Sequence, residues 1–453
     1  MAKLKTVFIC SNCGVQSAKW IGRCPSCNEW NTYHEEVISK SSATKTQVSN
    51  KNAGPFIISE IPVESEERIV LYDNELNRVL GGGIVKGSIV LLGGEPGIGK
   101  STLALQLALN TNGIKSLYVS GEESAQQIKL RAQRLTEKSD NCYIYCDNSL
   151  ENVIAQCDQV QPGIIFIDSI QTLYTDQFDA TQGSIVQVRE CAARLGRYAK
   201  ENNIPLILIG HINKEGSLAG PKVLEHAVDV VLQFEGDQNY VFRVLRSLKN
   251  RYGATPEIGI YEMQQSGLQI VENPSEILLG KNEDNLSGVT VACMINGIRP
   301  FLIEMQALVS SAVYGTPQRS CTGFDTRRLN MLLAVLEKRA GFHLVSKDVF
   351  LNVAGGIKSA DPAVDLAIIS AVLSSSIDRP VNKSFCFAAE VGLTGELRPV
   401  NRIEHRISEA DRLGFEKIFI SKYNINKKDF SKFNISIEVH NRVEDVFKLL
   451  FKK

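Results

Sequence analysis

Short apolar runs alternate with amphipathic stretches between Arg68 and about Glu272. The apolar runs predict β-strands over residues 88–92, 116–120, 164–167, 205–209 and 228–234. These runs contain almost no polar residues, as expected for strands that are covered on both faces. Strands of this kind, separated by amphipathic stretches, predict an α/β fold with a mainly parallel sheet.

The pattern changes on either side of this region. The chain has 453 residues, more than one hydrophobic core usually supports, so we expect several domains. Residues 1–35 carry two cysteine pairs, and the polar residues 36–58 predict a linker. The α/β region then spans residues 59–275. A last domain spans residues 285–453, with a predicted strand over 301–309 and predicted helices over 328–339 and 365–373.

Composition and charge exclude some classes of protein. Hydrophobic residues make up 43% and charged residues 22% of the chain, which is typical of globular proteins. Lysine plus arginine equals aspartate plus glutamate at 50 each, so a nucleic-acid surface must be a local patch. The sequence has no apolar run of 18 residues and no signal-peptide core at its start, and its 11 cysteines do not suggest a disulfide framework. We therefore expect a cytoplasmic protein with no membrane contact.

The segment after the predicted strand 88–92 matches the phosphate-binding P-loop pattern G-x-x-x-x-G-K-[ST]. Its glycines let backbone amides surround phosphates, and the N-terminus of the following helix favours their negative charge. Lys100 is expected to reach the β- and γ-phosphates of ATP, and Ser101 to bind Mg²⁺. The predicted ATP-binding residues are Gly94, Glu95, Pro96, Gly97, Ile98, Gly99, Lys100 and Ser101.

Two other predicted strands end in acidic residues. Asp168 follows the strand 164–167, where its carboxylate can hold the water shell of Mg²⁺ opposite Ser101. Glu122 and Glu123 follow the strand 116–120. Glu122 is the candidate general base for the attacking water, whereas Glu123 is better explained by the favourable position of an acid at a helix N-terminus.

Cys10, Cys13, Cys24 and Cys27 form two Cys-x-x-Cys pairs, with ten residues between the pairs. Four thiolates suit a closed tetrahedral Zn²⁺ site, and a segment with so few apolar residues needs a metal to fold. The spacing is shorter than the usual interval of about 15–20 residues, but it fits a rubredoxin-like pair of knuckles. A redox role is the alternative. We expect one structural zinc ion per chain, without His34 as a ligand.

Lys249 and Arg251 follow a further predicted strand, 241–245. Basic residues in such a place are usually solvated. In ring-forming ATPases, however, they can reach the γ-phosphate bound to a neighbouring subunit. The residue types alone do not decide between these two interpretations.

Several longer motifs occur together and in a fixed order. Besides the cysteine pairs and the P-loop, they are residues 118–124 (YVSGEES), 211–216 (HINKEG), 219–226 (AGPKVLEH) and 249–253 (KNRYG). In this combination the chain resembles, over essentially its full length, the RadA (Sms) family of bacterial DNA-repair proteins, which are RecA-related ATPases. The resemblance implies a RecA-like P-loop core, an N-terminal zinc finger and a C-terminal Lon-protease-like α+β domain.

The resemblance also implies an activity and partners. It implies a homo-hexameric ring that binds ATP between subunits, is stimulated by single-stranded and branched DNA, and promotes branch migration beside the RecA recombinase. Glu122 matches the acid that activates water in this class. Lys249 and Arg251 match the family's signature pair, which is expected to act in trans. This sequence has Tyr252 where the family usually has phenylalanine.

Two loops, 175–189 and 213–221, correspond to the DNA-facing loops of this class. Arg189, Lys214 and Lys222 are therefore candidate contacts to DNA phosphates, because phosphate neutralisation supplies most non-specific affinity. For each of the three, an ordinary surface charge is the alternative interpretation.

The C-terminal domain resembles the proteolytic domain of Lon, but it departs from the Ser–Lys dyad that such proteases need. Ala363 occupies the position of the serine, and Glu404 occupies that of the lysine. We therefore expect no peptide hydrolysis, and a domain that serves oligomerisation and DNA binding. Arg327 and Arg328 are the candidates for its basic face.

Two other classes of function are kept as alternatives. One is an ATP-dependent protease of the Lon kind, against which the missing dyad argues. The other is a nucleotide-switched ATPase of the KaiC kind, which shares the strand end at Glu122 and Glu123 but lacks the cysteine pairs and the Lon-like domain.

Overall fold

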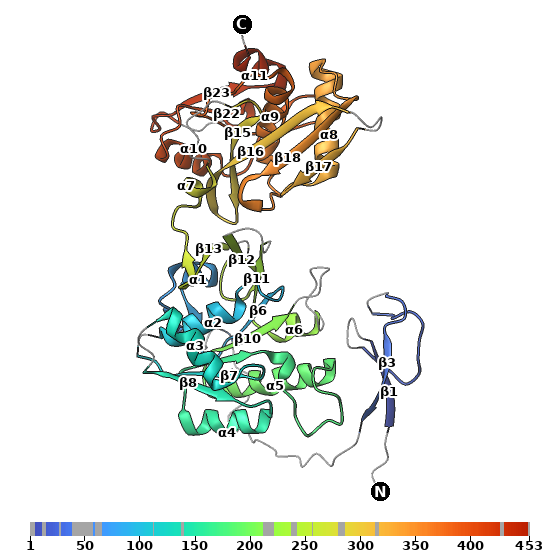
Figure 1. The fold of residues 1–453 in the computed structure, drawn as a ribbon, viewed down its shortest axis with the longest axis vertical. Helices are drawn as coiled ribbons and strands as arrows, with labels where there is room; N and C mark the ends of the chain where they lie inside the picture. The colour runs from blue at the N-terminus through green and yellow to red at the C-terminus, as the bar shows by residue number, and fades with distance from the viewer. Residues whose placement is uncertain are drawn as a thin grey trace. The chain divides into compact units, whose positions relative to one another are not determined.

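The chain folds into two compact units, one built from the residues up to Glu235 together with Arg243–Ile270, the other from Gly236–Phe242 together with Val271–Lys453 (Figure 1). The structure is a computed structural model. It describes residues 5–10, 15–26, 29–38, 58, 66–111, 113–136, 140–211, 222–236, 242–255, 257–279, 286–312, 317–425 and 430–451. Among these residues, no helix combines the length and the apolar character that crossing a bilayer requires.

The N-terminal segment forms a small antiparallel sheet in the order β2-β1-β3. Its strands are β1 (Lys5–Cys10), β2 (Gln16–Ser17) and β3 (Tyr33–Ile38). The first cysteine of each pair makes the same kind of backbone hydrogen bond: the N–H of Cys10 donates to the carbonyl of Val15 (3.0 Å), and that of Cys24 donates to the carbonyl of Glu29 (2.9 Å). The repeated bond fits the predicted pair of knuckles.

The first unit is built on a nine-stranded sheet in the order β14-β13-β12-β11-β6-β10-β9-β7-β8. Six neighbouring strands, from β11 to β8, are parallel, whereas β12 runs antiparallel to β11 and β14 antiparallel to β13. The predicted mainly parallel sheet is therefore confirmed. The strands are β6 (Ile89–Gly94), β7 (Ser116–Ser120), β8 (Cys142–Cys146), β9 (Ile164–Asp168), β10 (Leu206–His211), β11 (Val230–Glu235), β12 (Phe242–Asn250), β13 (Ile258–Gln264) and β14 (Gly267–Ile270).

Helices cover both faces of this sheet. Successive strand residues point to opposite faces, so Leu91 joins the core under α4 and α5 while Leu92 joins the core under α1, α2 and α3. The smaller elements are β4 (Arg68–Ile69), β5 (Ile84–Val85) and the 3₁₀ turn η2 (Ile170–Thr172). The helices are α1 (Asn74–Leu80), α2 (Lys100–Leu109), α3 (Ala125–Leu135), α4 (Leu150–Val160), α5 (Ile185–Glu201) and α6 (Lys222–Ala227).

The second unit is an α+β domain with a mixed seven-stranded sheet, in the order β17-β18-β16-β15-β19-β22-β23. Its helix α9 is buried at every position from 365 to 374, which makes it the centre of this domain. The elements are α7 (Pro274–Leu278), β15 (Val289–Asn296), β16 (Arg299–Ser311), β17 (Arg319–Thr322), α8 (Thr326–Ala340), β18 (Lys347–Val353), η3 (Ala354–Gly356), η4 (Pro362–Val364), α9 (Asp365–Ile377), β19 (Phe385–Ala388), β20 (Glu390–Val391), β21 (Leu397–Arg398), α10 (Ile403–Arg412), β22 (Lys417–Ser421), η5 (Lys422–Asn424), β23 (Ser436–His440) and α11 (Val443–Leu450).

Two predicted boundaries differ from the structure. Residue 275, the predicted end of the ATPase domain, lies inside α7, and the Ser275 hydroxyl binds within the second unit: it donates to Glu409 (2.9 Å) and accepts from the Leu302 N–H (3.1 Å). The strand predicted over residues 241–245 continues as β12 to Asn250. Lys249 therefore lies inside a strand instead of after one.

Candidate active site

The P-loop connects β6 to α2 at the carboxyl edge of the parallel strands. Gly99 precedes α2 with φ 115°, a conformation that glycine adopts readily and other residues do not. A side chain at Gly94 would place its Cβ 3.0 Å from the Phe234 Cβ and 3.2 Å from the Phe234 carbonyl oxygen. Gly99 thus suits the backbone conformation of the loop, and Gly94 suits the close approach of β11.

Lys100 is almost fully buried below this loop, with 3% of its surface exposed. Its ammonium donates to the carbonyl oxygens of Gly94 (2.8 Å) and Glu95 (2.9 Å). Burial lowers the pKa of Lys100 to about 8, although Asp168 and Glu122 act in the opposite direction. A cation held in this way has lost much of its water and interacts strongly with an incoming phosphate.

We expect the affinity for ATP to fall as the pH rises above about 8. Lys100 loses its proton there in the free protein, whereas bound phosphates favour the charged form, so binding must take up a proton. The Kd for ATP should then rise by about tenfold per pH unit, measured by calorimetry between about pH 7 and about pH 10. Lys100→Arg is the control, because a guanidinium stays charged over this range. A wild-type Kd that does not change with pH would contradict the assignment.

Asp168 lies at the end of β9 and is held from the neighbouring strand. The hydroxyl of Tyr118, a fully buried residue of β7, donates to the Asp168 carboxylate. Arg131 of α3 donates in turn to the Tyr118 hydroxyl (3.3 Å) and pairs with Glu123 (2.8 Å). Tyr118 and Arg131 were not among the residues predicted from the sequence. Their role in holding Asp168 depends on contacts between different elements of the fold. The one local indication in the sequence is a tyrosine, which has a polar hydroxyl, inside an otherwise apolar strand.

The two acids after β7 have different partners. Glu123 pairs with Arg131, as an acid with a structural role would, whereas Glu122 accepts a hydrogen bond from the Ser169 hydroxyl (3.0 Å). Gly121 allows the segment after β7 to pack closely against the segment after β9, because a Cβ at Gly121 would lie 2.0 Å from the Thr172 hydroxyl. Glu122 therefore sits beside the segment that follows Asp168, and its role as general base stays a prediction.

The residues at this edge fit a magnesium nucleotide. Ser101 is the second residue of α2. Asp168 is the last residue of β9, and this strand contacts α2. A hydroxyl and a carboxylate are the oxygen ligands that Mg²⁺ prefers, usually together with phosphate oxygens and water. When bound, the ion neutralises charge on the phosphates.

Lys249 and Arg251 lie at the opposite edge of the same sheet. Through β11, Lys249 is level with Leu91 of β6, three residues before Gly94. At about 3.3 Å per residue, its backbone lies about 10 Å along the strands from the start of the P-loop, and that of Arg251 lies farther. The two cations are therefore near the amino edge of the parallel strands, away from the phosphate site of their own subunit.

Asp229 organises this cationic edge. Its carboxylate, 2% exposed, accepts from the Arg251 guanidinium (3.0 Å) and from the Ile89 N–H (3.1 Å), and lies 3.7 Å from the Lys200 ammonium. The Lys249 ammonium donates to the carbonyl oxygens of Glu225 (2.6 Å) and Val228 (2.7 Å). Arg251 keeps 55% of its side chain exposed, so its guanidinium is accessible from outside the subunit.

The ribbon fits the predicted zinc site as far as it is described. Cys10 and Cys24 are fully buried in one cluster with Tyr33, although they are far apart in the sequence. Cys10 Sγ lies 3.1 Å from the Thr32 hydroxyl, and the Tyr33 hydroxyl donates to Cys24 Sγ (3.7 Å). Hydroxyl groups around sulfur suit metal-binding thiolates. Cys13 and Cys27 lie outside the described residues.

The predicted DNA contacts are only partly within the described residues. Arg189 is exposed, but it lies on α5 and not in a loop, because Ser184 caps this helix. Lys214 is outside the described residues, and Lys222 begins α6 with a side chain that is not described. The loop before α5 is held by Gln187, whose amide donates to Phe178 and Ala180 (3.1 Å each).

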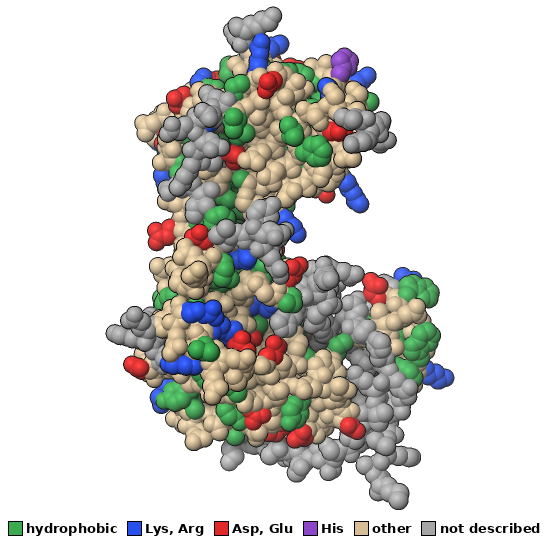
Figure 2. Space-filling model, viewed as in Figure 1, with side chains coloured by type: hydrophobic (Ala, Val, Ile, Leu, Met, Phe, Trp, Pro, Cys, Tyr) green, Lys and Arg blue, Asp and Glu red, His purple; other side chains and the backbone are tan. Residues whose placement is uncertain are grey.

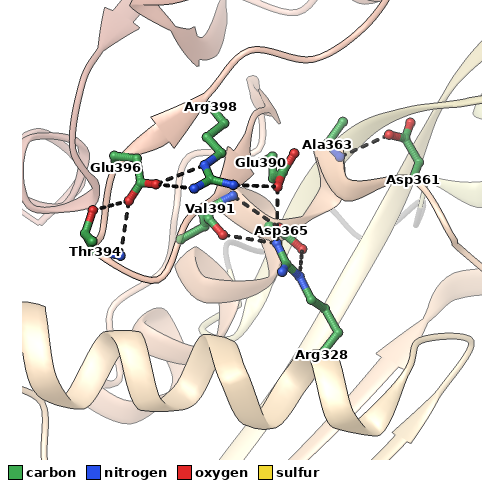
Figure 3. Close-up of polar contacts among 9 residues, drawn as sticks. All are labelled: Arg328, Asp361, Ala363, Asp365, Glu390, Val391, Thr394, Glu396 and Arg398. Carbon is green, nitrogen blue, oxygen red and sulfur yellow. Dashed lines mark hydrogen bonds and ion pairs between the residues drawn. The ribbon is translucent and has the colours of Figure 1, made fainter.

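In the second unit, the two residues predicted at the Ser–Lys dyad positions have different surroundings. Ala363 is fully buried, and its N–H donates to Asp361 (3.0 Å; Figure 3). The cation that reaches this point is Arg406, 3% exposed and 2.7 Å from the other Asp361 oxygen. Glu404 faces away and pairs with Lys432 at the surface (3.6 Å). Arg406 and Ala363 thus share Asp361 as a partner, and the alignment of Glu404 with the lysine of Lon stays a prediction.

Arg328 also has a structural role that the sequence did not predict. It pairs with Asp365, which is fully buried at the start of α9, and donates to the Val391 carbonyl (3.0 Å; Figure 3). Burial raises the pKa of Asp365, and the Arg328 guanidinium opposes this shift. Arg328 is thus engaged inside the domain, which argues against a phosphate contact. Arg327, beside it, is exposed.

Three segments of the chain match known protein families. Residues 62–217 match the family of AAA domains, residues 8–35 match a rubredoxin metal binding domain, and residues 306–424 match subunit ChlI of Mg-chelatase. A solved KaiC-like protein from Pyrococcus horikoshii aligns with 46% of this chain and 100% of its own, at 18% identity and a TM-score of 0.39, a likeness too low to inform function.

Relatives match the chain over almost its whole length. DNA repair protein RadA from Listeria monocytogenes is 49% identical, with 93% of each chain covered, and that from Bacillus subtilis is 46% identical, with 94% of each chain covered. RadA from Streptococcus pyogenes is 44% identical over 100% of both chains. The chain therefore belongs to the family of the DNA repair protein RadA, with an N-terminal zinc ribbon, a P-loop ATPase domain and a C-terminal ChlI/Lon-like domain.

Proposed function

We propose that this protein is a DNA-stimulated ATPase that moves along DNA during recombinational repair. It would process recombination intermediates and promote branch migration of strand exchange begun by the RecA recombinase. The name of its relatives supports a role in DNA repair, and the P-loop domain supports ATP hydrolysis. Our proposal adds to DNA repair and ATP hydrolysis that the protein moves along single-stranded and branched DNA.

The observation that carries the proposal is the separation of Lys249 and Arg251 from the P-loop of their own subunit. Two cations at the amino edge of the strands cannot reach phosphates at the carboxyl edge of the same sheet. They can reach phosphates bound to a neighbouring subunit if subunits join head to tail, which gives a closed ring or an open filament. We propose a homo-hexameric ring with each nucleotide between two subunits.

In such a ring, the residues of two subunits share the chemistry. Lys100 neutralises the β- and γ-phosphates, Glu122 accepts a proton from the attacking water, and Asp168 is held in place by Tyr118. Arg251 of the adjacent subunit stabilises charge that develops in the transition state. Lys249 and Arg251 of the adjacent subunit bind ATP and then release its products. The interface between the two subunits therefore tightens and loosens with each turnover.

Peptide hydrolysis is the less supported alternative. Ala363 offers a methyl group where a nucleophilic hydroxyl is needed, and its inner neighbour Arg406 is tied to Asp361. A guanidinium does not deprotonate in proteins and so cannot act as the general base of a dyad. The ChlI/Lon-like domain is proposed instead to assemble the ring and to contact DNA, with Arg327 as its exposed basic candidate.

The direct test is extension of a joint DNA molecule. RecA is allowed to start strand exchange and is then removed, and the length of the new heteroduplex is followed with this protein and ATP. We expect heteroduplex growth that requires ATP hydrolysis and stops with a non-hydrolysable analogue. If the joint does not lengthen under conditions where ATP is consumed, branch migration is not the function.

A further inference from the structure

The chain contains two tryptophans, Trp20 and Trp30, and both lie in the zinc ribbon with their indole rings exposed. The exposed fractions are 54% for Trp20 and 66% for Trp30. The core of the ribbon consists of Cys10, Cys24 and Tyr33, with Phe8 and Val15 against it, and it includes neither indole. The large rings therefore face outward. Exposing this much apolar surface to water is unfavourable, and such exposed surface is typical of binding sites.

The backbone holds both rings beside one glycine. The Gly22 carbonyl accepts from the Asn31 N–H (2.8 Å), and Arg23 forms a β-bridge with Trp30. A Cβ at Gly22 would lie 3.7 Å from the Trp20 ring and 3.8 Å from the Trp30 ring. The two indoles thus lie against the same glycine, in a backbone segment that is paired by a hydrogen bond and a β-bridge.

Positive charge accompanies the rings. The Arg23 guanidinium stacks over the Trp30 ring, 5.8 Å from its centre. Lys19 precedes Trp20 in a turn held by Ser17, whose hydroxyl donates to the Lys19 carbonyl (2.6 Å). Lys19, Trp20, Ile21, Arg23 and Trp30 are all exposed, and we name them the tryptophan patch. Figure 2 shows hydrophobic side chains at the surface of the N-terminal module.

We propose that the tryptophan patch binds unpaired nucleobases of single-stranded DNA by stacking. This inference rests on the proposed function, which supplies DNA as the partner. Flat aromatic rings next to cations bind single strands without regard to sequence, because every base has a π-face and every linkage has a phosphate. Paired bases are stacked inside a duplex and do not offer their faces, so the patch distinguishes single-stranded from double-stranded DNA.

The test uses the tryptophan fluorescence of the full-length protein, excited where tyrosine does not absorb, which comes from the patch alone because the chain has no other tryptophan. Oligothymidylate should quench the indole emission in a saturable manner. An abasic oligonucleotide of the same length, with the same phosphates but no bases, should not. Equal quenching by both oligonucleotides would mean attraction without stacking and would overturn the proposal. A response to RecA but not to oligothymidylate would overturn it in favour of a protein partner.

Variants separate the patch from the rest of the molecule. Trp20→Ala and Trp30→Ala should each weaken oligothymidylate binding by about fivefold to a hundredfold in anisotropy titrations, and Trp→Phe at the same positions should restore most of it. The matched control is Tyr423→Ala, which removes an aromatic ring that is 49% exposed and also carries a lysine (Lys422, 5.1 Å), but in the second unit. Unchanged zinc content shows that the ribbon of each variant is folded.

ATP hydrolysis in the same samples distinguishes this inference from the proposed function. If oligothymidylate stimulates hydrolysis but leaves the indole emission and the affinity of Trp20→Ala unchanged, the stacking site is wrong and the DNA-stimulated ATPase stands. If it neither stimulates hydrolysis nor quenches the emission, both fall. Stimulation together with quenching that the abasic strand does not reproduce supports both.

Discussion

Arg251→Ala is expected to reduce ATP turnover by about a thousandfold or more while leaving the subunit folded. A cation supplied in trans to a phosphoryl transition state contributes about 10³–10⁵ to the rate in related ATPases and GTPases. The fold should tolerate the change, because the Arg251 side chain is 55% exposed and the Asp229 carboxylate keeps the Ile89 N–H and the Lys200 ammonium as partners. Hydrolysis is measured on the purified variant, with thermal unfolding as the check on stability.

Mixing the variant with wild-type protein tests whether Arg251 acts across an interface. If it does, one variant subunit inactivates its neighbour's site, and activity should fall more steeply than the wild-type fraction. A decline in simple proportion to that fraction would contradict the trans role. Lys200→Ala is the matched control, since Lys200 also lies within 3.7 Å of Asp229 but on α5, and its loss should leave turnover nearly unchanged.

Lys100→Ala should abolish hydrolysis to about the same extent, for a different reason. The ammonium is buried at the P-loop, where no other described lysine or arginine replaces it, and its desolvation strengthens its action on phosphate charge. A single preorganised charge of this kind contributes about 10²–10³ or more to the rate. The measurement is single-turnover hydrolysis at saturating ATP, which separates chemistry from binding.

The control for this variant is Lys115→Ala, which removes an exposed lysine before β7, at the amino edge of the same sheet. It should hydrolyse ATP at nearly the wild-type rate. Robust turnover by Lys100→Ala would show that the nucleotide site lies elsewhere. Mixing also distinguishes the two variants: Lys100→Ala leaves Arg251 intact, so it still supplies a cation to its neighbour's site.

The sequence predicted the features that depend on local spacing. Five of the nine strands in the large sheet (β6, β7, β9, β10 and β11) were recognised because each is a short apolar run between polar segments, and β7 was predicted over the same residues that it occupies. The P-loop was recognised because its glycines and Lys100 stand at fixed intervals between a strand and a helix. Such patterns reflect backbone requirements that do not depend on distant residues.

Features that depend on pairing between distant elements were not predicted. The buried position of Arg406 was not predicted, because it depends on pairing with Asp361, whereas Glu404, two residues earlier on α10, pairs with Lys432 at the surface. Arg328 resembled a surface cation because its buried partner, Asp365, is on another helix. Tyr118 gained its role only from the register of β7 with β9.

The most direct test of the account is the rate of ATP hydrolysis without nucleic acid, with single-stranded DNA and with a branched DNA. The account predicts clear stimulation by single-stranded or branched DNA, and no response in Lys100→Ala under any of the three conditions. A wild-type rate that is the same in all three would leave the ATPase site intact but would contradict a motor that acts on DNA.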